Sequence, residues 1–115
     1  MPETAMRDEI PPGTLYMLIL KTLVPSAKLH GYEIASSIER ISGDVLQVEE
    51  GSLYPALQRM LLKGWVTAEW GVTAGNRRAR YYRLTPAGRK QFQAEQAQYH
   101  RVSAAIQKVL QMATP

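Results

Sequence analysis

The spacing of hydrophobic residues changes along this 115-residue chain at Trp65, from a helical repeat to an alternating one. Before that point, apolar side chains recur every three or four residues, which is typical of amphipathic helices that pack on a core. We predict helices over residues 13–24, 31–42 and 52–63 and a short strand over residues 45–49. The first part of the chain is therefore expected to be a group of three short helices.

The second part of the chain alternates polar and apolar residues, as half-buried strands do. We predict strands over residues 65–72 and 77–84, joined by a turn over 73–76 whose glycine and asparagine suit a tight reversal. The threonine and proline at 85–86 then supply a helix cap and a favoured first helical residue. No proline or strand signal interrupts the sequence from there to about residue 113, so the chain is expected to end in one long helix.

This order of elements is that of a winged helix-turn-helix domain followed by an extra helix. The expected fold class is mainly α with a β-hairpin wing. We divide the chain into a flexible N-terminus over residues 1–10, a winged-helix domain over 11–85 and a C-terminal dimerisation helix over 86–113. Such domains place their third helix in the major groove of DNA and their hairpin beside it.

Basic residues are concentrated in one stretch of the chain. Between Glu69 and Glu95 there is no acidic residue, and the basic residues of this stretch are Arg77, Arg78, Arg80, Arg83, Arg89 and Lys90. The stretch carries a charge of +6 while the whole chain carries +4, so the remainder sums to −2. Solvated surfaces commonly mix the two signs, so a strip of one sign indicates a polyanion partner, most simply double-stranded DNA. The alternative is a winged-helix module that binds an acidic protein.

Two sets of side chains are candidate DNA contacts. On the third predicted helix, the positions that face away from the apolar stripe are Ser52, Tyr54, Gln58 and Arg59, with Ser52 also the expected helix cap. Hydroxyls and helix N-termini bind phosphates, and glutamine and arginine pair with adenine and guanine edges. An ordinary solvent-facing helix surface is the alternative. On the hairpin the candidates are Arg77, Arg78 and Arg80, because a basic ribbon can follow phosphates or enter a minor groove.

The last predicted helix has apolar residues at coiled-coil spacing. The seam consists of Phe92, Tyr99, Val102, Ile106 and Val109. At about 1.5 Å per residue the helix is about 40 Å long, which exceeds the breadth of a small domain of about 30 Å. We therefore expect it to project from the core and to pack against the same helix of a second copy, forming a homodimer. The alternative is that it folds back on its own core.

The composition argues against several other classes of protein. The chain has no cysteine, which excludes disulfides and thiolate metal sites. No apolar run reaches the roughly 20 residues of a membrane span, and the polar N-terminus differs from a signal peptide, so we expect a cytoplasmic protein. With two histidines and no catalytic motif, we expect no enzyme activity, cofactor or metal. His30 is expected to order the start of the second helix.

Three segments resemble motifs of the PadR family of bacterial transcriptional regulators: residues 30–34 (HGYEI), 51–57 (GSLYPAL) and 80–89 (RYYRLTPAGR). They occur in the family's order, and the resemblance spans residues 11 to 110. The single C-terminal helix is similar to that of the smaller PadR subfamily. The resemblance implies a homodimeric winged-helix repressor that binds an inverted-repeat operator and that phenolic acids or drug-like aromatic molecules release.

The same resemblance implies roles for particular residues. It makes Tyr32, Ser52, Tyr54 and the basic wing residues DNA contacts. Multidrug-sensing relatives carry a tryptophan in the last helix that lines an apolar pore at the dimer interface, and the matching position here is Tyr99. Tyr99 is therefore the candidate effector-binding residue, although tyrosine departs from the pattern of those relatives. Simple packing in the seam is the alternative role for Tyr99.

Overall fold

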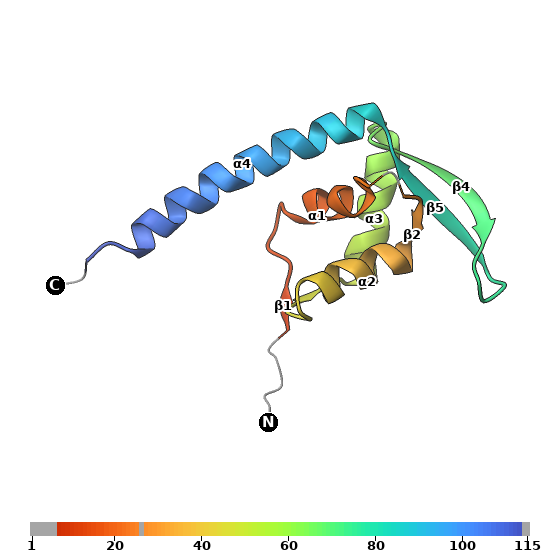
Figure 1. Cartoon of the computed structure of the whole chain (residues 1–115), viewed down its shortest axis with the longest axis horizontal. Helices are drawn as coiled ribbons and strands as arrows, with labels where there is room; N and C mark the ends of the chain where they lie inside the picture. Colours follow the sequence, from red (N-terminus) through yellow and green to blue (C-terminus); the bar gives the residue numbers. More distant parts are fainter. Residues whose placement is uncertain (1–6, 26, 114–115) are drawn as a thin grey trace, which may run out of the picture.

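The computed structural model describes residues 7–25 and 27–113, which form a small helical core with a hairpin on one side and a long helix on the other (Figure 1). The helices are α1 (Leu15–Leu23), α2 (Gly31–Ile41), α3 (Glu50–Leu62) and α4 (Pro86–Leu110), and the hairpin strands are β4 (Val66–Val72) and β5 (Arg78–Leu84). The predicted fold class, a winged helix-turn-helix with an additional C-terminal helix, is confirmed.

Side chains from α1, α2 and α3 meet in one hydrophobic core. The side chains that are fully buried there are Ile19, Leu20, Leu23, Ile34, Leu53, Leu57 and Met60. Val66, Tyr82 and Phe92 extend this core to the hairpin and to α4. Because residues three or four apart lie on one side of a helix, each short helix buries a single stripe and leaves its other side exposed. The helical spacing of the sequence therefore accounts for the core.

The start of α2 is held by a reciprocal pair of hydrogen bonds. The backbone N–H of Glu33 donates to Nδ1 of His30 over 3.4 Å, and the backbone N–H of His30 donates to the Glu33 carboxylate over 3.0 Å. This arrangement satisfies amide groups that the end of a helix leaves without a partner. The prediction that His30 orders the start of the second helix is confirmed.

A cap and a close approach fix the corner between β5 and α4. The Thr85 hydroxyl accepts a hydrogen bond from the N–H of Gly88 over 2.9 Å and donates one to the carbonyl of Gly64 over 2.6 Å. Any side chain at Gly88 would collide with the carbonyl oxygen of Trp65. The predicted cap at Thr85, followed by Pro86, is confirmed. This corner sets the direction in which α4 leaves the core.

Helix α3 begins two residues before its predicted start. The N–H of Leu53 donates to the carbonyl of Glu49 over 2.9 Å, so the first turn already contains Ser52. No side chain caps this helix, and the prediction of Ser52 as its cap is wrong. Gly51, which the sequence suggests as a boundary, is accommodated within the helix, so Ser52 lies in the first turn and not at the cap position.

The strand β2 (Leu29–His30) was not predicted. It pairs antiparallel with β5, Leu29 opposite Tyr82 and His30 opposite Tyr81, and gives a three-stranded sheet in the order β2-β5-β4. Two residues are too few to show an alternating pattern, and the surrounding sequence is typical of a loop. The strand ties the start of α2 to the hairpin.

A second small sheet corrects the prediction for the N-terminus. The strand β1 (Asp8–Glu9) pairs in parallel with β3 (Leu46–Gln47), which lies within the strand predicted over 45–49. The prediction of a flexible segment over residues 1–10 is therefore wrong for Asp8 and Glu9, while residues 1–6 lie outside the described residues. Strand pairing uses backbone groups, so a polar segment can pair without any apolar signal in its sequence.

The wing is the hairpin of β4 and β5, whose strands begin and end within one residue of their predicted positions. Asn76 adopts a φ of 62° in the predicted turn. Ala68 lies directly opposite Tyr82, and Val66 is two residues before Ala68 on the same strand. Val66 and Tyr82 therefore lie on the same face of the sheet, and both are buried. Tyr82 is thus the inward-facing tyrosine, an assignment that alternation alone left open between Tyr81 and Tyr82.

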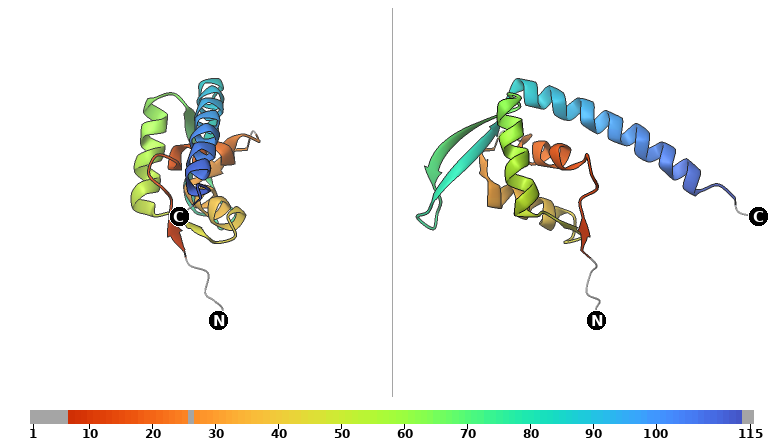
Figure 2. Two further views of the ribbon diagram at one scale, coloured as in Figure 1. Left: turned by 90° about the vertical axis from the view of Figure 1, so that its left-hand side faces the viewer. Right: turned by 180° about the vertical axis from the view of Figure 1, so that it is seen from behind.

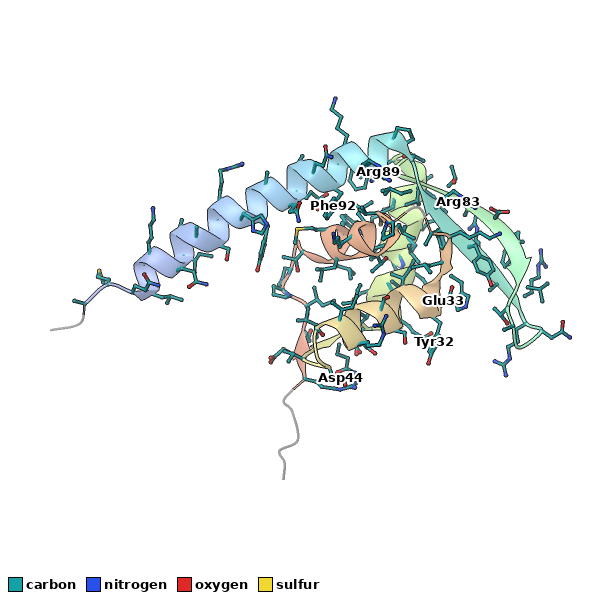
Figure 3. The ribbon with its side chains drawn as sticks, in the orientation of Figure 1. Tyr32, Glu33, Asp44, Arg83, Arg89 and Phe92 are labelled. Carbon is teal, nitrogen blue, oxygen red and sulfur yellow. The ribbon has the colours of Figure 1, made fainter. Side chains whose placement is uncertain are left out.

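Helix α4 packs on the core only at its beginning. Phe92, 6% exposed, lies between α4 and α1 (Figure 3), whereas the C-terminal part of the helix extends away from the domain (Figures 1 and 2). The radius of gyration is 16.3 Å, against about 13 Å for a compact domain of this length. Assignment of Phe92 to the dimer seam is therefore corrected, because its own core already buries it. The expected projection of α4 from the core is confirmed.

Candidate nucleic-acid interface

The groove between the wing, the start of α2 and the exposed side of α3 collects most of the predicted DNA contacts. It has a volume of about 770 Å³. Its lining includes Tyr32, Tyr54, Arg77, Arg78 and Arg80 from the predicted set, together with His30, Trp70, Thr73 and Tyr82. Residues from three separate segments of the sequence thus meet at one surface.

A glycine at the start of α2 lets α3 approach closely. A side chain at Gly31 would lie 2.8 Å from Cε1 and 2.9 Å from the hydroxyl oxygen of Tyr54, so the phenol ring occupies the space that a β-carbon would need. Tyr54 nevertheless remains about half exposed, with its ring at the rim of the groove. The contact places the first turn of α2, which includes Tyr32, beside α3.

The floor of the groove is apolar where the wing joins the core. Tyr82 is buried there, and burial raises the pKa of its phenol above the ordinary value, while the neighbouring Arg80 lowers it by a smaller amount. A neutral phenol at this position leaves the positive charge of the nearby guanidinium uncompensated. The groove therefore has an uncharged base and a basic outer wall.

The outer part of the wing presents an aromatic ring between two arginines. The strand register places Trp70 opposite Arg80 and Val72 opposite Arg78, all on the face that is buried nearer the core. The guanidinium carbon of Arg78 lies 4.3 Å from the centroid of the Trp70 rings, and that of Arg80 lies 5.9 Å from it. Sequence reasoning missed Trp70, although the alternation that gives it the same face as Arg80 could have identified it.

On the opposite face of the wing, the basic side chains have an acidic partner within the chain. Glu69 forms ion pairs with Arg83 at 3.9 Å and with Lys28 at 4.0 Å. Arg89, at the start of α4, donates to the carbonyl of Val24 at the end of α1 over 3.1 Å (Figure 3). Two members of the basic stretch thus have partners inside the protein.

Unlike Arg83, the three arginines of the groove have no acidic partner in the described part of the chain. Among residues 7–25 and 27–113, no acidic side chain forms an ion pair with Arg77, Arg78 or Arg80. All three are exposed. Their charges add on one side of the wing, which makes this surface attractive to a polyanion, whereas on the other side Glu69 offsets part of the positive charge.

The remaining predicted contacts of α3 lie elsewhere. Arg59 donates a hydrogen bond from Nη1 to the hydroxyl oxygen of Tyr16 over 3.2 Å, which raises the pKa of its guanidinium. Arg59 and Ser52 both line a second cavity of about 690 Å³, between α3, α1 and Pro11–Pro12. Gln58 is exposed but lines neither cavity. Residues two and five positions from Tyr54 point in other directions because a helix turns by about 100° per residue.

The projecting half of α4 carries a bare apolar side. Tyr99, Val102, Ile106 and Val109 are each between 45% and 67% exposed and continue the line of Phe92 along the helix. Tyr99 and Val102 also line a cavity of about 550 Å³ at the angle between α4 and the start of α1, beside Tyr16 and Met17. The predicted effector residue therefore adjoins a cavity, and its role stays a prediction.

In the part of the chain that the structure describes, no group of three or more histidine, aspartate or glutamate side chains is placed to hold a metal ion. No helix among the described residues combines the length and the apolar character that crossing a bilayer requires. The chemistry that the surface offers is that of cations, hydroxyl groups and aromatic faces.

Comparison with known proteins relates the chain to a family of transcriptional regulators. Residues 19–94 match the model of the transcriptional regulator PadR-like family. A protein of Lysinibacillus sphaericus that carries the name uncharacterized protein X is 30% identical over 84 residues, which cover 73% of this chain and 76% of that protein.

Solved structures share the fold over most of the chain. A transcriptional regulator from Clostridium thermocellum has a TM-score of 0.76 and 27% identity, covering 84% of this chain and 92% of that one. A PadR family transcriptional regulator from Eggerthella lenta has a TM-score of 0.72 and 28% identity, covering 88% of this chain and 85% of that one. The family match extends over more than half of the sequence and includes α2, α3 and the wing. The chain belongs to the PadR-like family of transcriptional regulators.

Proposed function

We propose that this regulator is a repressor that binds double-stranded DNA as a homodimer at an inverted-repeat operator in the cytoplasm. The observation that carries the proposal is the groove in which Arg77, Arg78 and Arg80 meet Tyr32 and Tyr54 without an acidic partner among the described residues. Cations and hydroxyls around one concave surface match the phosphates of a duplex backbone.

The two parts of this surface have different proposed tasks. The wing arginines bind phosphates or enter the minor groove, which gives affinity with little dependence on sequence. Tyr54 and Gln58 contact base edges in the major groove and give operator preference. Ser52 and Arg59 lie on the side of α3 away from the wing, so we assign them to the backbone that flanks the major groove.

Homodimer formation supplies the symmetry that an inverted repeat requires. The seam of Tyr99, Val102, Ile106 and Val109 is exposed in a single chain, and burying it against the same helix of a second copy removes this apolar surface from water. Two copies of α3 about 34 Å apart would then enter successive major grooves on one side of the duplex. Dimerisation and operator binding are coupled in this proposal.

A small aromatic effector is the proposed means of release. Tyr99 offers an aromatic face and a hydroxyl beside the cavity between α1 and α4. An effector bound there would favour a dimer geometry in which the two α3 helices no longer match the operator. It can weaken operator binding only by the ratio of its affinities for the two geometries.

The proposal is tested by selecting genomic fragments with the purified protein. The expected result is enrichment of fragments that share one inverted repeat, and loss of that enrichment when Arg77, Arg78 and Arg80 are all replaced by alanine. The matched control is Arg83→Ala, which removes a charge that is paired with Glu69 on the opposite face of the wing. Retention of an acidic protein in preference to every DNA fragment would contradict the proposal and support the protein-binding alternative.

A further inference from the structure

Trp70 is the largest exposed aromatic side chain on the groove face of the wing, and nothing in the proposed function uses it. It is 58% exposed, and Val72, two residues further along the same strand, is 64% exposed. Both lie on the face that carries Arg78 and Arg80. The tip of the wing thus combines an apolar centre with cations on its edges.

We propose that Trp70 is a DNA-contacting residue of the wing that also positions Arg78 and Arg80 for phosphate binding. The inference rests on the proposed function and deepens it, because it names the part of the duplex that the wing touches. The indole lies against the deoxyribose rings at the edge of the minor groove, and the two guanidinium groups reach the phosphates on either side.

The short distance between the Arg78 guanidinium and the Trp70 rings supports the positioning role. A guanidinium that stacks on an indole uses its flat face, so its N–H donors still point outward in the plane of the group. Arg78 lies 4.3 Å from the ring centroid, although Arg80 is the residue directly opposite Trp70 in the strand pair. The indole therefore leans toward the tip of the hairpin and orders both arginines before a ligand arrives, which lowers the entropy lost on binding.

The other face of the wing carries an aromatic ring that is covered by contacts within the chain. There, Tyr81 covers Gly71, where a β-carbon would lie 2.9 Å from its Cε2, and Lys28 lies 5.4 Å above the Tyr81 ring. Tyr81 is only partly exposed as a result. Trp70 has arginines at its edges but keeps more than half of its surface open to solvent, which fits contact with a ligand.

Deoxyribose provides the matching chemistry for this surface. Along a duplex, the apolar faces of the sugars alternate with phosphates, and side chains that enter the minor groove combine apolar wedges with arginine. An apolar indole flanked by two guanidinium groups has the same alternation. An acidic peptide would satisfy the arginines but would leave the indole without a regular apolar partner.

The first experiment uses the fluorescence of the tryptophans as a contact probe. The chain has two tryptophans, so Trp65→Phe leaves Trp70 as the only tryptophan, and Trp70→Phe leaves Trp65 as the control, with excitation at a wavelength that tyrosine does not absorb. Each variant is titrated with the operator duplex recovered by selection, and fluorescein anisotropy on the same duplex reports total binding. The expected result is a change of Trp70 emission that saturates with the anisotropy, and unchanged Trp65 emission.

The outcomes separate this inference from the proposed function. Full binding by anisotropy with constant Trp70 emission overturns the Trp70 contact and leaves the proposed function intact. No binding of any duplex at low salt overturns both. If Trp65→Phe does not fold, the alanine variants below test the inference in a chain that retains Trp65.

The second experiment is a double-substitution cycle in DNA affinity. We expect Trp70→Ala to weaken duplex binding about five- to tenfold and Trp70→Phe to weaken it about twofold or less, because phenylalanine keeps an aromatic face. The loss caused by Arg78→Ala should be about threefold smaller when Trp70 is already alanine. Arg77→Ala, whose side chain does not stack on Trp70, is the matched control and should cause the same loss in both backgrounds. Equal losses for Arg78→Ala in the two backgrounds would overturn the positioning role.

Discussion

The wing and α4 both project from the core into solvent, but the wing exposes arginines whereas α4 exposes apolar side chains. On the wing, the face that buries Val66 and Tyr82 continues outward with Trp70 and two arginines. On α4, the side that buries Phe92 continues outward with tyrosine and aliphatic residues. Figure 1 shows the two projections on opposite sides of the three-helix core.

The difference supports the partners proposed for the two projections. Water solvates arginine well, so the wing is stable when exposed and gains most from a polyanion that releases counterions. Water solvates the side chains of α4 poorly, so that surface gains most from an apolar surface like itself. These properties agree with the proposal that the wing binds DNA and that α4 binds a second copy of the chain.

The largest expected effect comes from placing a charge in the apolar projection. Ile106→Asp should give monomers, because an unpaired carboxylate in a buried interface destabilises it by several kcal/mol. Operator affinity should fall at least about a hundredfold as the two half-sites lose their linkage. Sedimentation velocity and binding titrations measure both effects. Ala104→Asp, on the opposite side of α4, is the control, and dimers of the Ile106 variant would argue against the seam.

The boundary between the two parts of α4 predicts different roles for two aromatic residues. Phe92→Ala should lower the free energy of unfolding by about 3–5 kcal/mol, because it opens a cavity between α4 and α1. Tyr99→Ala should instead shift the concentration at which dimers form. Denaturant unfolding at several protein concentrations distinguishes the two. Similar unfolding curves for both variants would show that the division of α4 at this point is wrong.

The two faces of the wing predict unequal losses of DNA affinity. Arg80→Ala should weaken duplex binding about tenfold, since this guanidinium has no acidic partner in the described chain and is available for phosphate. Arg83→Ala should change it by about twofold or less, because Glu69 already pairs with that guanidinium. Fluorescence anisotropy with one duplex measures both affinities. Equal losses of affinity for Arg80→Ala and Arg83→Ala would mean that the duplex does not bind one face of the wing in preference to the other.

The smallest expected effect separates α3 from the wing. Tyr54→Ala should lower the preference for the operator over an unrelated duplex about fivefold, because the shortened side chain no longer reaches a base edge. Gln58→Ala should act in the same direction. Competition between the two duplexes measures the preference. A loss that is the same on both duplexes would make these side chains positioning residues without a role in sequence selection.

Much of the core could be predicted from the sequence because local spacing determines it. Ile34 and Leu57 occupy the buried side of their helices wherever those helices lie, and the arginines of the wing follow from charge and strand alternation alone. Phe92 and Tyr99 occupy equivalent positions of one repeat, yet only Phe92 is buried by its own chain. That distinction depends on where α1 ends in space, which local spacing does not encode.

The candidate site could be predicted only in part for a related reason. The role of Ser52 depends on where α3 begins. The orientation of the Arg59 side chain depends on its hydrogen bond to Tyr16, a residue 43 positions away in the sequence. The strand β2 that joins α2 to the wing is too short to leave a pattern. Charge identified the wing arginines but not Trp70 between them, because an aromatic residue in a strand usually indicates core packing.

The salt dependence of operator binding tests the central claim most directly. For the unmodified chain, the logarithm of the association constant should fall steeply and linearly with the logarithm of salt concentration. With Arg77, Arg78 and Arg80 replaced by alanine, the slope should flatten by about one unit for each phosphate that the variant no longer neutralises. An unchanged slope in this triple variant would contradict the assignment of the wing as the surface that binds the DNA backbone.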